Sequence, residues 1–165
     1  MENKYKITLR VLFWGLTLAL MVIIFAHSAQ VAEVSSATSA SFTAKVLSVV
    51  YPSFNDFEAA RQESIISSLQ HLVRKSAHFT VYLALGVTSF SALCTYDLKR
   101  KTKAISALSL CVAYAVSDEL HQLFVPGRAG RIGDVLLDSC GAVCGILLVM
   151  GVIALYKKKH NGGLV

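Results

Sequence analysis

The fold is decided by one stretch of sequence, DELHQLFVPGRAGRIGDVLLDSCGAVCG, residues 118–145. This stretch places charged side chains on both sides of a Pro-Gly turn, and apolar sequence continues from it in both directions. Residues 104–114 before it contain no charged side chain, and residues 142–156 after it contain none. The pattern predicts two apolar helices that are joined by a polar turn and carry their charges at the same end.

The composition of the whole chain agrees with a membrane protein. Of its 165 residues, 55% are hydrophobic and only 16% are charged, with a mean hydropathy of +0.58, whereas a soluble domain carries about 25% charged residues. Disordered chains, collagen-like chains and basic nucleic-acid-binding arms need more charge, Gly or Pro than this. All four cysteines lie in apolar stretches, which indicates neither a disulfide framework nor a zinc site.

Four stretches approach the roughly 20 apolar residues that cross a bilayer as a helix. They are residues 7–26, 77–96, 104–125 and 135–156. We therefore predict a single all-α domain over residues 1–165, a polytopic membrane protein built as a four-transmembrane-helix bundle. An alternative for the first stretch is a signal peptide, because bases precede it and small residues follow it.

The charges predict an orientation. Lys and Arg are concentrated in cytoplasmic flanks of membrane proteins, and one side of the four spans holds ten bases and two acids, near the first residues, residues 97–103 and residues 157–159. We expect both termini on that cytoplasmic side. The other side then receives an extracytoplasmic segment, residues 27–75, in which Pro52 predicts a turn and Asn55 with Glu58 predicts a helix cap. From Phe57 the apolar spacing predicts an amphipathic helix that lies on the membrane surface and runs into the second span.

Ionisable side chains gather at the outer ends of three spans. Such groups are costly within a membrane and indicate a functional site. Helical spacing places Lys75, His78 and Tyr82 on one face, and it does the same for Asp118, His121 and Gln122. Snorkelling or simple neutralisation is the alternative, but Asp118 and Asp138 have short side chains inside their spans. We expect one outward pocket, with candidate acid–base residues His78, His121, Asp118, Glu119 and Asp134, candidate anion-binding residues Arg74, Lys75, Arg128 and Arg131, and supporting residues Tyr82, Gln122, Asp138, Ser28 and Gln30.

Two glycine pairs accompany this cluster. Gly141 and Gly145 form a G-x-x-x-G pair on the stripe of Asp134 and Asp138, which predicts close packing against another helix. Gly127 and Gly130 leave the turn beside Arg128 free to adopt unusual backbone angles.

In order and spacing, several motifs resemble the VanZ-like family over nearly the whole chain. They are His27-Ser28-Ala29-Gln30, Arg74-Lys75-Ser76-Ala77-His78-Phe79 with Tyr82 and Gly86, Asp118-Glu119-Leu120-His121-Gln122 with Phe124, Pro126-Gly127-Arg128, and Asp134-Val135 with Asp138, Gly141 and Gly145. The resemblance implies a multi-pass bacterial cell-membrane protein, in a family whose founding relative is associated with low-level resistance to the glycopeptide teicoplanin. Two positions depart from the pattern: Val81 stands where many relatives carry Glu, and Asp138 stands where Asn is also common.

Two functions fit these residues. The first is a membrane enzyme that acts on a lipid-linked cell-wall precursor or glycopeptide, with arginines holding an anionic group and a histidine–carboxylate pair moving a proton. A divalent metal bound by some of the same acids and histidines is compatible with it. The second is a binding or envelope-remodelling factor without turnover. A transporter fits less well because the inner halves of the spans offer no polar path, and no nucleic-acid partner is expected.

Overall fold

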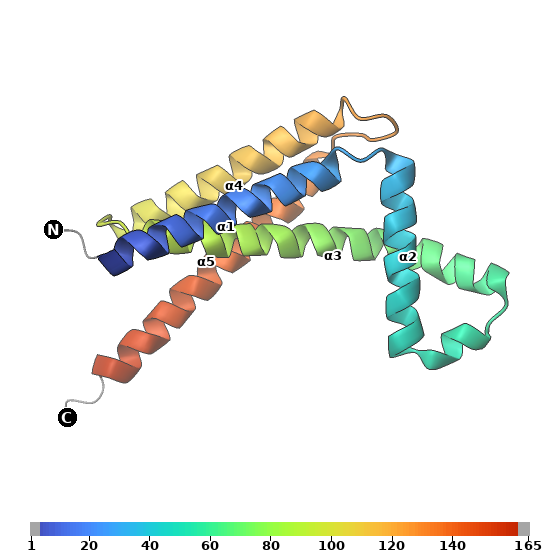
Figure 1. Cartoon of the computed structure of the whole chain (residues 1–165), viewed down its shortest axis with the longest axis horizontal. Coiled ribbons are helices and arrows are strands. Elements are labelled where there is room, and N and C mark those ends of the chain that lie inside the picture. Colours follow the sequence, from blue (N-terminus) through green and yellow to red (C-terminus); the bar gives the residue numbers. More distant parts are fainter. Residues whose placement is uncertain (1–3, 162–165) are drawn as a thin grey trace.

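The computed structural model describes residues 4–161, and within them the chain is all-helical, as predicted (Figure 1). The elements are α1 (Lys4–Ser28), α2 (Ala32–Val50), a short 3-10 helix η1 (Pro52–Asp56), α3 (Ala59–Cys94), α4 (Arg100–Gln122) and α5 (Ile132–Asn161). Helices α1, α3 and α4 run along a common direction, and α5 crosses behind them and diverges toward the C-terminal end.

Three of these helices, α1, α3 and α5, are long and apolar enough to cross a membrane. Helix α4 does not reach the same hydropathy, because Asp118 and Glu119 lie near its end and three bases lie near its start. It nevertheless packs against α1, α3 and α5. The structure therefore supports a membrane protein with three apolar helices of spanning length, and a fourth span at α4 stays a prediction.

Backbone-to-backbone packing of α5 on α3 organises the bundle. A Cβ atom at Gly141 would collide with the carbonyl oxygen of Phe79, and one at Gly145 would collide with that of Leu83. From the other side, Gly86 of α3 lies against the backbone of Ala142. The packing role predicted for the G-x-x-x-G pair is confirmed, and the close approach fixes which face of α5 turns toward α3.

The core continues from this contact to α1 and α4. Tyr82 and Leu85 of α3 are fully buried with Ile24 of α1 and Cys111 of α4. In addition, the hydroxyl of Tyr114 donates a hydrogen bond to a carbonyl oxygen of α1. Helix α1 is thus an integral part of the bundle.

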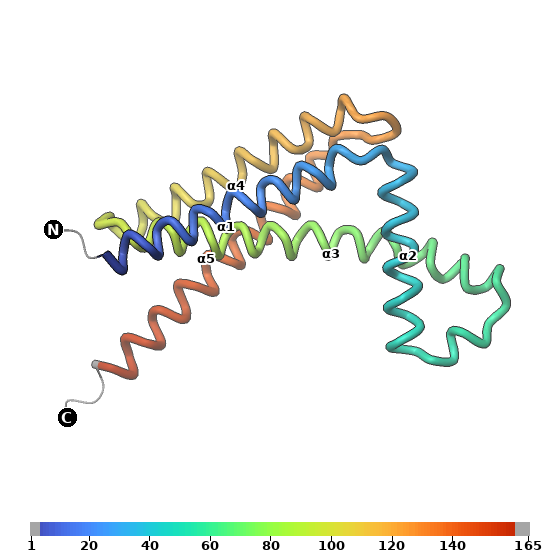
Figure 2. Tube along the Cα trace, in the orientation of Figure 1, coloured from blue at the N-terminus to red at the C-terminus, as the bar shows by residue number. Residues whose placement is uncertain are grey.

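The segment between α1 and α3 differs from its prediction. Its Ser- and Ala-rich part forms helix α2, which lies across the direction of the bundle (Figure 2). The turn at Pro52 is confirmed, but the Asn55 cap is wrong: Asn55 lies within η1, Phe54 beside it is buried, and Glu58 is the N-cap residue of α3.

Helix α3 is one continuous helix of 36 residues. At 1.5 Å per residue it is about 54 Å long, well beyond the roughly 30 Å of a bilayer core. Its first turns continue the axis of the apolar part and extend past α2 (Figure 1). The predicted continuity with the second span is confirmed. The position of the first turns on a membrane surface stays a prediction, and α2 is the helix that lies across the bundle (Figure 1).

Charge is sorted between the two ends of the bundle. Arg10 of α1 donates a hydrogen bond to Thr95 at the end of α3 (Nε to Oγ1, 3.2 Å) and stacks on Tyr96. Arg100 of α4 reaches the carbonyl oxygen of Met150 in α5 (3.4 Å). Three basic clusters therefore share one end, where His160 of α5 also lies, and the acids of α4 and α5 gather toward the other with the histidines of α3 and α4.

Candidate functional site

A polar cavity of about 180 Å³ lies at the end of the bundle opposite the basic clusters. Helix α3 contributes four lining residues with helical spacing, so that one face of α3 forms a wall. Helices α4 and α5, the loop between them and the first residue of α2 complete it. The lining residues are Ala32, His71, Arg74, Lys75, His78, Glu119, Gln122, Gly127, Arg128, Ala129, Arg131, Asp134 and Leu137.

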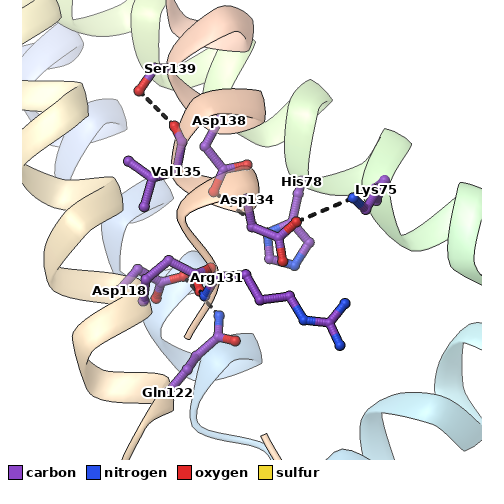
Figure 3. A network of polar contacts seen from close by, with 10 residues as sticks. Lys75, His78, Asp118, Gln122, Arg131, Asp134, Val135, Asp138 and Ser139 are labelled. Atoms are coloured by element: carbon purple, nitrogen blue, oxygen red, sulfur yellow. Dashed lines mark hydrogen bonds and ion pairs between the residues drawn. The ribbon is translucent and has the colours of Figure 1, made fainter. Parts of the chain in front are cut away.

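His78 lines this cavity, and two buried acids, Asp118 and Asp138, lie near it (Figure 3). Asp138 of α5 is fully buried, and its Oδ2 is 3.8 Å from Nδ1 of His78 in α3. Asp118 of α4 is 4% exposed, and its Oδ2 accepts a hydrogen bond from Nε2 of Gln122 (3.3 Å). Because Nδ1 of His78 faces Asp138, Nε2 is the ring nitrogen that can exchange a proton with a ligand.

Several buried polar atoms around these acids have no hydrogen-bond partner in the described residues. Both carboxylate oxygens of Asp138, Oδ1 of Asp118 and the hydroxyls of Tyr82 and Ser28 belong to this group. Buried polar atoms are normally paired, so such a concentration is typical of a functional site rather than of a structural core.

Two further acids are bound at the rim. Glu119 accepts a hydrogen bond from the backbone N–H of Arg131 at Oε2 (2.7 Å), which ties the 123–131 loop to the end of α4. Asp134 forms an ion pair with Lys75 (Oδ1 to Nζ, 3.4 Å). Gly127 adopts a φ of 74°, a left-handed conformation that glycine favours. These contacts hold the loop over the cavity.

Arg74 and Arg128 both line the cavity, and neither has a carboxylate partner in the described residues. Arg128 donates to the carbonyl oxygens of Gln30 (2.8 Å) and His27 (3.0 Å). Arg74 donates to Oγ of Ser36 (3.0 Å), and its Nε is buried without a partner. Burial first, and then the nearby guanidinium of Arg74, lower the pKa of Arg128. Two such cations side by side favour an anion.

The structure brings most of the predicted site residues together. Arg74, Lys75, His78, Glu119, Gln122, Arg128, Arg131 and Asp134 line the cavity, and Asp118, Asp138, Tyr82 and Ser28 are buried. His121 lies elsewhere: its ring packs against Phe25 of α1, with centroids 4.8 Å apart, and it does not line the cavity. Gln30 contributes its carbonyl oxygen to Arg128.

Two residues at the site escaped the sequence analysis. His71 lines the cavity and precedes Lys75 by four positions, so helical spacing alone would have found it. Ser36 binds Arg74 from α2, 38 residues away, and no local pattern signals that contact.

The residues present do not form a recognisable metal centre. Within residues 4–161, no three His, Cys, Asp or Glu side chains are grouped so that they could hold a metal ion.

Fold and cavity together define the class: a helical membrane protein with a cationic and acidic site at one end of its bundle. The sequence profile of the VanZ/LLP1 family matches residues 13–155, and the chain belongs to this family. No curated protein and no solved structure matches the chain.

Proposed function

We propose that this protein spans the cell membrane four times, with both termini in the cytoplasm, and that its polar cavity opens outward and acts on a lipid-linked cell-envelope precursor. The observation that carries the proposal is the pair Arg74 and Arg128, which lie beside the cavity without a carboxylate partner in the described residues. An anionic headgroup would provide both guanidinium groups with the negatively charged acceptor that the described residues do not supply.

The acid–base part of the proposal rests on His78. Its Nδ1 faces Asp138, so the carboxylate orients the ring and stabilises its protonated form. Nε2 can then accept a proton from, or donate one to, a group held by Arg74 and Arg128. We assign His78 as the acid–base residue and Asp138 as its positioning residue. The other acids, Asp118, Glu119 and Asp134, contribute negative electrostatic potential near this pair.

A contribution to low-level teicoplanin resistance is part of the proposal. Its support is the family membership together with a site suited to an anionic, lipid-bearing molecule. Teicoplanin carries an acyl chain, so a protein embedded in the bilayer can meet it, or the precursor it binds, at the membrane surface.

The proposal is tested by expressing Arg74→Gln, His78→Ala and His121→Ala in a teicoplanin-susceptible bacterial host. Lys45→Gln is the matched control, because Lys45 is an exposed base on α2 outside the cavity. After membrane insertion is verified, susceptibility and the profile of lipid and wall precursors are measured. We expect the Arg74 and His78 variants to lose the phenotype and a precursor to accumulate in the His78 variant. Full activity of Arg74→Gln would contradict the proposal.

A binding factor without turnover is the second candidate. It is favoured by the position of His121, which leaves His78 as the one of the two predicted acid–base histidines that lines the cavity. This candidate predicts that Arg74→Gln abolishes the phenotype whereas His78→Ala retains it without any change in precursors.

A further inference from the structure

An apolar groove adjoins the polar cavity. It has a volume of about 330 Å³ and runs between α1, α2 and α3, within the range of small-molecule binding pockets. Ile24 of α1, Phe42 of α2 and Val81 of α3 are among its apolar walls. Arg74, His78 and Arg128 line both the groove and the polar cavity, so that the two sites are continuous at these three residues.

Small residues of α2 create the groove. Ser35, Thr38 and Ser39 face α1 and α3 at helical spacing, and their short side chains leave the space that larger ones would fill. The hydroxyls of Thr38 and Ser39 donate to carbonyl oxygens one turn earlier in α2, at 2.9 Å each. These hydroxyl protons are therefore already bonded, and the groove surface is apolar over most of its length. The Ser- and Ala-rich stretch of the sequence thereby acquires a role.

The mouth of the groove is open. Ile23 and Phe42 are 47% and 58% exposed, and they lie on α1 and α2 respectively. If α1 and α3 cross the bilayer, this opening faces hydrocarbon, from which an alkyl chain can enter laterally without passing through water. Arg74 lines both the groove and the polar cavity, and its buried Nε has no hydrogen-bond partner in the described residues.

We propose that the groove binds one alkyl chain of a phosphate-bearing lipid while Arg74 and Arg128 hold its headgroup in the polar cavity. The inference rests on the proposed function for the headgroup, and it adds the lipid class and the path of the chain. Charge complementarity at one end and apolar walls at the other match a single-phosphate amphiphile. Because the chain moves from hydrocarbon into an apolar groove, its burial adds little hydrophobic free energy, and the pairing of the phosphate with the two arginines supplies the selectivity.

The test uses the full-length protein in phosphatidylcholine vesicles with a photoactivatable diazirine in the acyl chain of a probe lipid. The probe is phosphatidic acid, and phosphatidylcholine with the same labelled chain is its comparison. Labelled peptides are mapped by mass spectrometry. We expect phosphatidic acid to label residues 23–42 and 73–82 several times more strongly than phosphatidylcholine does. Equal labelling by the two lipids, spread over the outward faces of α1 and α5, would overturn the inference.

Two matched variants separate the groove from the headgroup site. Ser39→Phe fills the groove, whereas Ala37→Phe adds the same ring on an exposed position of α2 that does not line it. We expect Ser39→Phe to lower labelling of the groove by phosphatidic acid to the level of phosphatidylcholine, because the ring occupies the space of the chain, and Ala37→Phe to leave it unchanged. If Ser39→Phe does not fold, Val81→Phe narrows the same groove from α3.

Arg74→Gln distinguishes failure of this inference from failure of the proposed function. We expect it to reduce phosphatidic acid labelling to the level of phosphatidylcholine. A loss with Arg74→Gln but none with Ser39→Phe or Val81→Phe would leave the anion site standing and overturn the groove. A loss with Ser39→Phe but none with Arg74→Gln would overturn the joined site, because the chain would then bind without headgroup recognition.

Discussion

At the scale of single residues, His78 and Asp138 form a histidine–carboxylate pair in the site. Asp138 is fully buried, and His78 is the basic group it faces at 3.8 Å. Burial of a carboxylate without a partner is costly, whereas removal of both partners avoids most of that cost. The pair is therefore best probed by changing its members separately and together.

We expect His78→Ala to lower the free energy of unfolding by about 1 to 3 kcal/mol, because it leaves Asp138 buried and unpaired. Adding Asp138→Asn should recover part of that loss, so that the two changes are not additive. His71→Ala is the control, since His71 lines the same cavity and forms no ion pair with a carboxylate in the described residues. Thermal unfolding of the four variants and the wild type measures the coupling, and strict additivity would refute it.

Single residues also show which features of the site the sequence predicts. Helical spacing predicted the shared face of Lys75, His78 and Tyr82, and the position of Asp118 beside Gln122, because both depend only on local geometry. Spacing could not predict that His78 meets Asp138, which depends on the rotation of α5 against α3. Nor could it predict the contact of His121 with Phe25, which depends on the path of α1.

At the scale of elements, the close approach of α5 to α3 sets the rotation of α5 that brings Asp138 to His78. Gly145→Ala should destabilise the protein by about 1 to 3 kcal/mol, because the added Cβ collides with the carbonyl oxygen of Leu83 and forces the helices apart. Gly151→Ala on the same helix has open space within 4 Å of the added atom and should be neutral or slightly stabilising. Thermal unfolding compares the two directly, and equal effects would contradict the packing account.

Helix α2 and the 3-10 helix η1, which lie between α1 and α3, are the elements that the sequence predicted least well. Apolar length located α1, α3 and α5, because burial in hydrocarbon demands it. Helix α2 lacks that signal: its Ser- and Ala-rich face packs across α3 through small side chains, and only Thr43 within it is buried. The cap at Asn55 failed because η1 occupies Pro52–Asp56 and postpones the start of α3 to Ala59.

At the scale of the whole molecule, the number of spans decides which side the cavity faces. We expect single cysteines at Ser53 and Ala129 to react with a membrane-impermeant maleimide on intact cells, and one at Thr102 to react only after permeabilisation, because basic flanks stay in the cytoplasm. All three positions are exposed. The background is a variant without the four native cysteines. Labelling of Ala129→Cys and Thr102→Cys from the same side would show that α4 does not cross.

We propose that the polar cavity binds an anionic lipid headgroup through Arg74. The most direct measurement is the unfolding temperature of the purified protein as a function of added dihexanoyl phosphatidic acid, with dihexanoyl phosphatidylcholine as the comparison, because a ligand that binds only the folded state raises it. We predict a rise with phosphatidic acid alone in the wild type and in Lys45→Gln, and no rise in Arg74→Gln. Equal rises with both lipids, or an undiminished rise in Arg74→Gln, would contradict the claim.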